Sequence, residues 1–192
     1  MKKIFYFLFL ILIELNNSFC SSQTKPIRIL VITGGHEYNI EKFNQMLASL
    51  GDDIKFQVAE LPAAYDMFLP ENRNKYFHKP TILNGIEYPA SSYIHDLHFK
   101  VSICNHDNPV TIGLSDFEIF DETYKGFYVE EGVTPLLTTD EPSSTPIIGW
   151  SKMYGKAHIV TLQSGHDTPT FENPNYRKLL RQAIKWVYTN GQ

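Results

Sequence analysis

The chain has 192 residues, of which 43% are apolar and 14% aromatic, so it can bury one good core but hardly two domains. Its formal net charge is −4 at pH 7, and no stretch gathers charges of one sign. This balance argues against nucleic acid and against anionic membrane surfaces, because both are bound through clustered positive charge.

The N-terminus is typical of a secretory signal peptide, which we expect to span residues 1–20. Two lysines precede the apolar run 4–15, which is too short to cross a membrane, and small polar residues follow it. We therefore expect an exported protein, periplasmic or extracellular, whose mature chain begins near Ser21. A lipid anchor on Cys20 is the alternative, although the bulky Phe19 before it argues against a lipoprotein signal.

The remaining part, residues 27–190, predicts one domain that begins with a β-α-β unit. The β-branched run 27–33 is fit for a buried strand, and the apolar positions of residues 39–51 recur with a helical period. Residues 54–59 alternate as a second strand does. Together they predict the start of a doubly wound sheet.

Beyond this unit the regular pattern is lost. Residues 61–93 carry four prolines and no sustained apolar period, and they predict a loop with one short helical turn. Such a loop is longer than a compact domain usually contains. The pattern then predicts strands at 99–104, 133–138 and 158–163 and a closing helix over 176–188.

Two of the predicted strands end in the same kind of turn, with a glycine, a histidine and an acid. The two turns are Gly34-Gly35-His36-Glu37 and Ser164-Gly165-His166-Asp167. Because ligands bind at the carboxyl ends of the strands in open α/β sheets, we expect two imidazoles on one rim of the sheet. Either turn alone is better explained as a polar turn, and it is their agreement that favours a site.

Six short motifs are distributed from residue 27 to the C-terminus. They are Gly34-Gly35-His36, residues 108–114, residues 120–124, Trp150, Tyr154-Gly155-Lys156 and Gly165-His166-Asp167. Their order and spacing resemble the ThuA-like family of trehalose-utilisation proteins. The resemblance implies a three-layer α/β/α fold with a mostly parallel sheet, flavodoxin-like or class I glutamine amidotransferase-like. It also implies a role in the breakdown of trehalose, another disaccharide or a keto-sugar.

The chain departs from the family pattern near Tyr76 and Phe77. Family members carry two further strands, a helix and a histidine-bearing strand end at this point, a piece of roughly 30 residues or more. The resemblance therefore implies that central strands are lacking, together with the position of the nucleophile in amidotransferase relatives. The chain has no Gly-x-Cys-x-Gly or Gly-x-Ser-x-Gly turn, so we do not expect a glutamine amidotransferase.

His36, Glu122 and His166 are the residues that we expect to be catalytic. Imidazole changes charge nearest to neutral pH, so the two histidines suit the roles of general base and acid. Asp121 and Glu122 are adjacent, and on a strand they point to opposite faces, so only one can enter the site. The family pattern implies that this one is Glu122 and that Asp121 holds the loop.

The residues expected to bind substrate offer a sugar close backbone access, a hydrogen-bonding group or an aromatic face. They are Gly34, Gly35, Asp121, Tyr124, Trp150, Gln163, Gly165 and Asp167. The two aromatic residues have a competing structural explanation. Trp150 fits a place in the core as well as it fits a sugar platform, and Tyr124 fits the core better.

We expect no resident cofactor, and a divalent metal such as zinc is the rival chemistry. No two of its candidate ligands have ligand spacing in the sequence. These candidates are His36, His106, Glu122 and His166. His95 and His98 are the only close histidine pair, and their offset suits a helix. Because the neighbouring residues predict strand and turn, we interpret this pair as incidental.

Two functions follow from the sequence. The first is an exported sugar-catabolic protein, an isomerase, lyase or hydrolase that uses histidine and carboxylate groups for acid–base catalysis. The second is a non-catalytic carbohydrate-binding or interaction domain that has lost its reactive centre. In both, the expected partner is a small sugar, without a membrane span, and a homo-oligomer is compatible with either. A third interpretation is a truncated chain that does not fold stably.

Overall fold

A computed structural model describes residues 25–33, 37–60, 77, 79–126, 128–129, 131–155 and 157–190. The expected signal peptide, the turn Gly34-Gly35-His36 and residues 61–76 beside the expected deletion lie outside the described residues. In chain order the elements are β1 (Ile27–Thr33), α1 (Ile40–Ala48), β2 (Ile54–Glu60), β3 (Thr81–Leu83), β4 (Ile86–Tyr88), β5 (Ser92–Ile103), β6 (Phe117–Lys125), β7 (Thr134–Thr138), β8 (Ile147–Tyr154), β9 (Ala157–Leu162), α3 (Thr168–Glu172) and α4 (Pro174–Asn190).

The first three elements form the β-α-β unit that the sequence predicts. β1 and β2 pair in parallel along their whole length. Asn39 caps α1, since its side-chain oxygen accepts a hydrogen bond from the backbone N–H of Lys42 at 3.0 Å. Met46 and Leu47 of α1 are buried, which is why the helical period of this segment can be recognised in the sequence.

The remaining strands correct the expectation of a mostly parallel sheet. β6, β5, β7, β8 and β9 form a five-stranded sheet in that order, and every pairing in it is antiparallel. The connections explain this direction: residues 139–146 join β7 to β8 and residues 155–156 join β8 to β9, too few for the crossover that parallel strands need. Among the described strands, β1 and β2 are the only parallel pair, and they form a sheet of their own.

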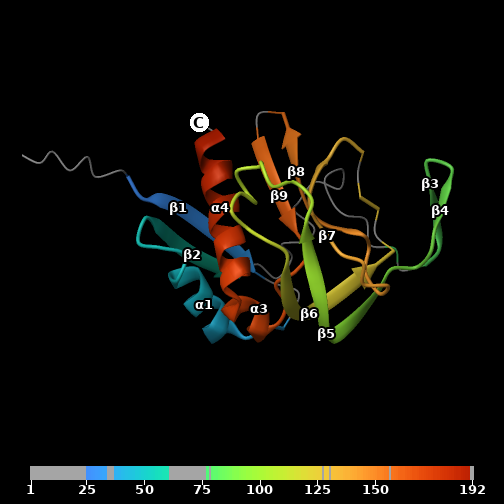
Figure 1. Cartoon of the computed structure of the whole chain (residues 1–192), viewed down its shortest axis with the longest axis horizontal. Helices are drawn as coiled ribbons and strands as arrows, with labels where there is room; N and C mark the ends of the chain where they lie inside the picture. The colour runs from blue at the N-terminus through green and yellow to red at the C-terminus, as the bar shows by residue number, and fades with distance from the viewer. Residues whose placement is uncertain are drawn as a thin grey trace, which may run out of the picture.

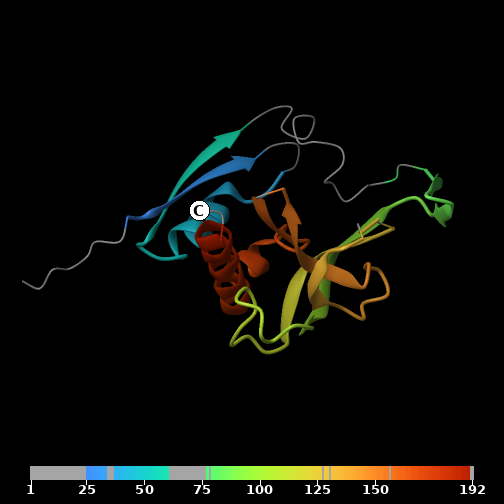
Figure 2. The ribbon, with the colours of Figure 1, turned by 90° about the horizontal axis from the view of Figure 1, so that it is seen from above.

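Helix α4 lies beside both of these sheets (Figures 1 and 2). Its side chains and those of β9 and β1 line one apolar groove. Asn173 begins the helix, because its side-chain oxygen accepts hydrogen bonds from the backbone N–H groups of Asn175 and Tyr176 at 2.9 and 3.2 Å. The closing helix predicted from the sequence is thereby confirmed. No helix in the described ranges is long and apolar enough to cross a membrane.

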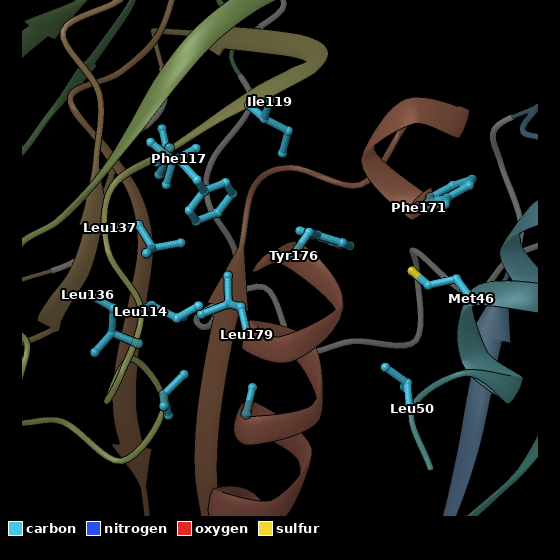
Figure 3. Packing of buried hydrophobic residues seen from close by; sticks show 14 of the residues in the cluster. Met46, Leu50, Leu114, Phe117, Ile119, Leu136, Leu137, Phe171, Tyr176 and Leu179 are labelled. Atoms are coloured by element: carbon cyan, nitrogen blue, oxygen red, sulfur yellow. The ribbon is translucent and has the colours of Figure 1, made fainter. Parts of the chain in front are cut away.

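One hydrophobic core connects these elements. Figure 3 shows buried side chains of α1, α3, α4, β6 and β7 in a single cluster. Leu136 of β7 is completely buried, and Phe171 of α3 and Leu179 of α4 are each 1% exposed. Because Met46 of α1 and Leu50 just after it belong to this cluster, the core links the β-α-β unit to the antiparallel sheet.

A short hairpin occupies part of the region that the sequence predicts to be a loop. β3 and β4 pair antiparallel across Asn84 and Gly85, whose φ angles are 52° and 78°. Positive φ at both positions is what a type I′ turn requires, and Asn-Gly between apolar residues is its usual sequence signal. The hairpin projects from the body of the molecule (Figure 1), and Ile82 and Ile86 on it are exposed.

Candidate functional site

The candidate site is built on β6, where two adjacent carboxylates are buried. Asp121 is 0% and Glu122 is 3% exposed, although neighbouring side chains on a strand point to opposite faces. A buried carboxylate is costly unless hydrogen bonds or positive charge compensate it. The surroundings of these two carboxylates therefore define what the site can do.

Asp121 holds the turn that follows β9. Its carboxylate oxygens accept hydrogen bonds from the backbone N–H groups of Gly165 at 2.6 Å and of His166 and Asp167 at 3.1 Å each. The N–H of Glu122 donates to it as well, at 2.9 Å. These donors compensate the buried charge and fix the position of His166. Asp121 thus faces the backbone, which agrees with the loop-holding role expected from the family pattern.

Gly165 allows this turn to pack closely on α4. Its φ of 123° lies in the region that favours glycine, and a Cβ atom there would lie 2.3 Å from the hydroxyl oxygen of Tyr176. That hydroxyl donates a hydrogen bond to the carbonyl of Ser164 at 3.0 Å. Burial raises the pKa of Tyr176, so the hydroxyl stays protonated and remains a donor.

Glu122 lies between two imidazoles. Its Oε1 is 3.4 Å from Nδ1 of His95, and its Oε2 is 3.6 Å from Nδ1 of His166. One ligand atom from each of the three side chains lies within 4.8 Å of the other two. The two rings are tilted against each other with centroids 5.3 Å apart. Tyr124, two residues along β6, donates its hydroxyl hydrogen to Oε2 of Glu122. We call His95, Glu122 and His166 the Glu122 cluster.

His95 reaches this cluster through an irregularity in β5. The pairing of β5 with β6 shifts register between Ile94 and Leu97, and Asp96 has a φ of 58°. Such a bulge re-aims the side chains next to it. Half of the His95 side chain remains exposed, at 47%, against 19% for His166 and 2% for Glu122. The cluster is therefore open to solvent on the side of His95.

Asp167 lies behind His166. Its Oδ1 is 3.9 Å from Nε2 of His166, the ring nitrogen that does not face Glu122. Burial raises the pKa of Asp167, and the negative charge of Asp121 adds to this effect. Its Oδ2 is buried and has no hydrogen-bond partner in the described part of the chain. Asp167 is thus a carboxyl group that retains its proton more readily than an exposed one.

Trp150 and Gln163, which were predicted to bind substrate, are not members of the Glu122 cluster. Trp150 on β8 is 6% exposed and pairs with Thr161 of β9, so it is packed in the interior and offers no open face. The side-chain amide of Gln163 is 3.4 Å from the hydroxyl of Thr145, and Gln163 borders a small space among core residues. Gly34-Gly35-His36 is outside the residues that the structure describes.

Two further histidines do not join the cluster. His106 follows the far end of β5, roughly 30 Å along the strand from His95, and is exposed. The His98 ring contacts Phe120, with centroids 4.7 Å apart. His106 was therefore wrongly included among the candidate metal ligands. Of the close pair His95 and His98, only His95 reaches Glu122.

Sequence reasoning named His95 but interpreted its pair with His98 as incidental, and it missed Tyr93 beside it. The ring of Tyr93 stands edge-on to His95 with centroids 5.1 Å apart, and the residue is 53% exposed. The available signal was a tyrosine and a histidine two residues apart, which share one face of a regular strand. Tyr93 was included in the predicted loop 61–93, and His95 was set aside because its offset from His98 suits a helix and because a single sequence has no marker for a bulge.

The fold is comparable to solved structures of low sequence identity. A ThuA-like protein from Parabacteroides merdae superposes with a TM-score of 0.61 at 15% identity, over 86% of this chain and 91% of that chain. PurLQS from Thermotoga maritima matches with a TM-score of 0.51 at 13% identity, over 85% of this chain and 100% of that chain. These likenesses define the class by its fold: a mixed α/β protein with the architecture of these two solved structures.

The family follows from the sequence comparison. The family model ThuA, described as trehalose utilisation, matches residues 71–187, which is more than half of the chain. This protein belongs to the ThuA family. A search of the curated proteins found no match. All three residues of the Glu122 cluster lie within the matched range, whereas His36 lies before it.

Proposed function

We propose that this protein acts on a small carbohydrate, a disaccharide such as trehalose or a keto-sugar, and that the reaction takes place at the Glu122 cluster. Membership of a family described by trehalose utilisation supports the substrate class. The observation that carries the proposal is the convergence of two imidazoles on one buried carboxylate, within 4.8 Å of one another. We also propose export of the protein, as the sequence of residues 1–20 predicts.

The cluster suits proton transfer. Isomerisation, elimination and hydrolysis of a sugar all require a proton to be taken from one atom and delivered to another, and imidazoles do this near neutral pH. His166 is held in place by the backbone bonds to Asp121, and His95 is accessible from solvent. Asp167, whose pKa is raised by burial, is a further acid group beside His166. His36 stays a proposed catalytic residue from the sequence.

Cysteine chemistry does not fit the described residues. Cys104 follows β5 at the end away from His95, and burial raises its pKa, which opposes formation of the thiolate nucleophile. This agrees with the expectation that the protein is not a glutamine amidotransferase.

A non-catalytic carbohydrate-binding domain is the second candidate. The exposed ring of Tyr93 beside His95 favours it, because an aromatic face packs well on the C–H side of a sugar ring. Such a domain would bind the sugar at the same place without turning it over.

The experiment combines turnover and binding measurements on trehalose and 3-keto-disaccharides. We expect Glu122→Gln and His166→Ala to lower turnover by about 100-fold or more. His98→Ala is the matched control, because His98 lies on the same strand as His95 but outside the cluster. Binding without turnover would favour the second candidate. If the protein neither binds nor turns over any of these sugars, the proposed substrate class is contradicted.

A further inference from the structure

We propose that His95, Glu122 and His166 hold a divalent transition-metal ion, and that zinc fits this donor set. The inference goes beyond the proposed sugar function and does not depend on it, since metal binding can be measured without a substrate. It replaces the ligand set that the sequence offered with one that the fold of β5, β6 and the turn after β9 brings together.

The distances within the cluster are those of ligands around an ion. A charge-assisted hydrogen bond between an imidazole and a carboxylate is about 2.7–2.9 Å long. The two Nδ1 to Oε distances are 3.4 and 3.6 Å, which is longer. Two ligand atoms bonded to a tetrahedral zinc ion at about 2.0–2.1 Å lie about 3.3 Å apart. The two distances end on different oxygens of Glu122, and one ligand atom of each residue lies within 4.8 Å of the other two, so small shifts of the side chains would bring all three around one ion.

The chemistry of the ligands selects the kind of ion. Two imidazoles and one carboxylate form the protein ligand set of many catalytic zinc sites, in which water takes the remaining position. Magnesium and calcium prefer sites made of oxygen atoms only, so two nitrogen ligands disfavour them. The half-exposed side chain of His95 leaves a way in for the ion and for a water molecule.

The local charge also calls for a cation. Glu122 is almost completely buried, Asp121 precedes it on β6, and Asp167 lies on the turn after β9, whose backbone N–H donates to Asp121. Within the described residues, no lysine or arginine side chain lies within 4.0 Å of these three carboxylates. Backbone N–H groups compensate Asp121, whereas the partners of the Glu122 carboxylate within the described ranges are the Tyr124 hydroxyl and the two imidazoles. A bound dication would supply the missing compensation.

The surroundings of the cluster match the outer layer of a metal site. Histidine ligands commonly donate their second ring N–H to a carboxylate, which fixes the ring and makes it a stronger ligand. In His166 that second nitrogen faces Asp167 at 3.9 Å, so an approach of about 1 Å completes the hydrogen bond. The hydroxyl of Tyr124 orients Glu122 in the same way.

An ion at this place would change how the proposed reaction runs. Zinc lowers the pKa of its bound water to about 7, so a hydroxide is available at neutral pH. This hydroxide would take up the proton from the sugar and become water, while the three side chains act as ligands. The carbonyl oxygen of a keto-sugar could also bind the open position and be polarised there. This step rests on the proposed function, whereas the metal site does not.

The test is zinc binding to the purified protein after treatment with a chelator. Calorimetric titration with zinc should give one equivalent per chain, and cobalt should give the visible absorption of a site with nitrogen ligands. We expect His95→Ala and Glu122→Gln to weaken zinc binding at least about tenfold, and Asp167→Asn to weaken it about tenfold or more. His98→Ala should leave the affinity unchanged. Zinc should raise the unfolding temperature of the wild type but not of His95→Ala.

The remaining outcomes separate the two proposals. Zinc binding that survives both His95→Ala and Glu122→Gln, or no zinc binding at all, overturns the inference. Each zinc-free variant is first shown to unfold cooperatively, so that a weaker affinity for zinc cannot be the result of misfolding. Zinc binding without sugar binding or turnover supports the metal site and contradicts the sugar function. Turnover by the zinc-free protein supports the sugar function and overturns the role of the ion in it.

Discussion

At the scale of single residues, the position of Gly165 admits no side chain. Its φ of 123° and the nearness of the Tyr176 hydroxyl exclude a Cβ atom. We expect Gly165→Ala to shift the turn that carries His166, to lower the free energy of unfolding by about 2 kcal/mol or more, and to abolish turnover. Chemical denaturation and a turnover assay measure these effects.

Gly132 provides the matched control for Gly165. Its φ of 78° is also positive, but nothing lies within 4 Å of an added Cβ atom. Gly132→Ala should therefore show the backbone penalty alone, about 1–2 kcal/mol, with turnover unchanged. Equal losses of stability and of turnover in both variants would contradict the assigned role of the Tyr176 contact.

The sequence revealed the carboxylates of the site better than its histidines. Successive side chains on a strand point to opposite faces, so Asp121 and Glu122 take different sides of β6. This local rule holds for parallel and antiparallel sheets alike. His95 could not be found in this way, because its place depends on a bulge in β5. The expected meeting of His36 with His166 stays a prediction, since the structure describes only the second of them.

At the scale of elements, the bulge in β5 decides whether His95 faces Glu122. Asp96 tolerates its positive φ, a glycine would adopt it freely, and a β-branched residue would be a marked outlier there. A strand without the bulge shifts its register by one residue and turns its side chains to the other face. We therefore expect Asp96→Val to weaken zinc binding at least about tenfold, and Asp96→Gly to retain it.

The measurement for Asp96 is a zinc titration of both variants, with circular dichroism to show that each has folded. If Asp96→Val binds zinc as tightly as Asp96→Gly, the bulge does not position His95. If both lose zinc, the Asp96 carboxylate itself is needed, which the geometry of the cluster does not predict.

A second prediction concerns the contact between α4 and the start of β2. Hydrogen bonds from Arg181 and Lys185 hold the pKa of Asp53 well below its usual range. A carboxyl group whose pKa is lower in the folded than in the unfolded state stabilises the fold at pH values above its unfolded pKa. This stabilisation is lost as the pH falls through its folded pKa. We expect Asp53→Asn to be slightly less stable than the wild type at pH 7, with a difference that vanishes in acid.

Unfolding temperatures of the wild type and Asp53→Asn across this pH range provide the measurement. The difference should also shrink in high salt, because all three side chains are partly exposed. A difference that persists unchanged in acid would show that Asp53 acts through something other than its charge.

The sequence also predicted some elements well and others not at all. The first and the closing helix were recognised because each buries one face of a helical period, and the strand 27–33 was recognised from its β-branched run, although Leu30 and Ile32 on it are exposed rather than buried. The antiparallel direction of the later strands was not predicted, because it depends on which strands pair and on short connections such as the two residues between β8 and β9. The hairpin β3-β4 had its Asn-Gly signal, which was overlooked among the prolines.

At the scale of the whole molecule, one core spans both sheets, so we expect a single unfolding transition. Leu179 is 1% exposed within this core, and Leu179→Ala should cost about 2–5 kcal/mol. Trp150 on β8 and Trp186 on α4 report on different elements by fluorescence. Their transitions should coincide with each other and with circular dichroism in the wild type and in Leu179→Ala.

Separate transitions for the two tryptophans would contradict a common core. The absence of any cooperative transition would instead favour the third interpretation of the sequence, a truncated chain that does not fold stably. Leu30→Ala is the control, because Leu30 is 62% exposed and its loss should cost far less.

The division of the strands into two larger sheets leaves an open groove in the molecule. It has a volume of about 480 Å³ and is lined mainly by apolar residues of β1, β9 and α4, among them Ile29, Leu162 and Ile184. Among the described strands, β1 pairs only with β2 and β9 only with β8. The family resemblance implies that central strands are lacking, and the groove lies between these two sheets.

The bonds from Asp121 to the backbone of residues 165–167 have a consequence for engineering. Peptide groups fix the placement of His166, so substitutions at the exposed Tyr93, whose ring contacts His95, should leave His166 where it is. Under the proposed function, substitutions at Tyr93 would change how a sugar is held while His166 keeps its place. A library randomised at Tyr93 should yield altered sugar preference while the position of His166 stays constant.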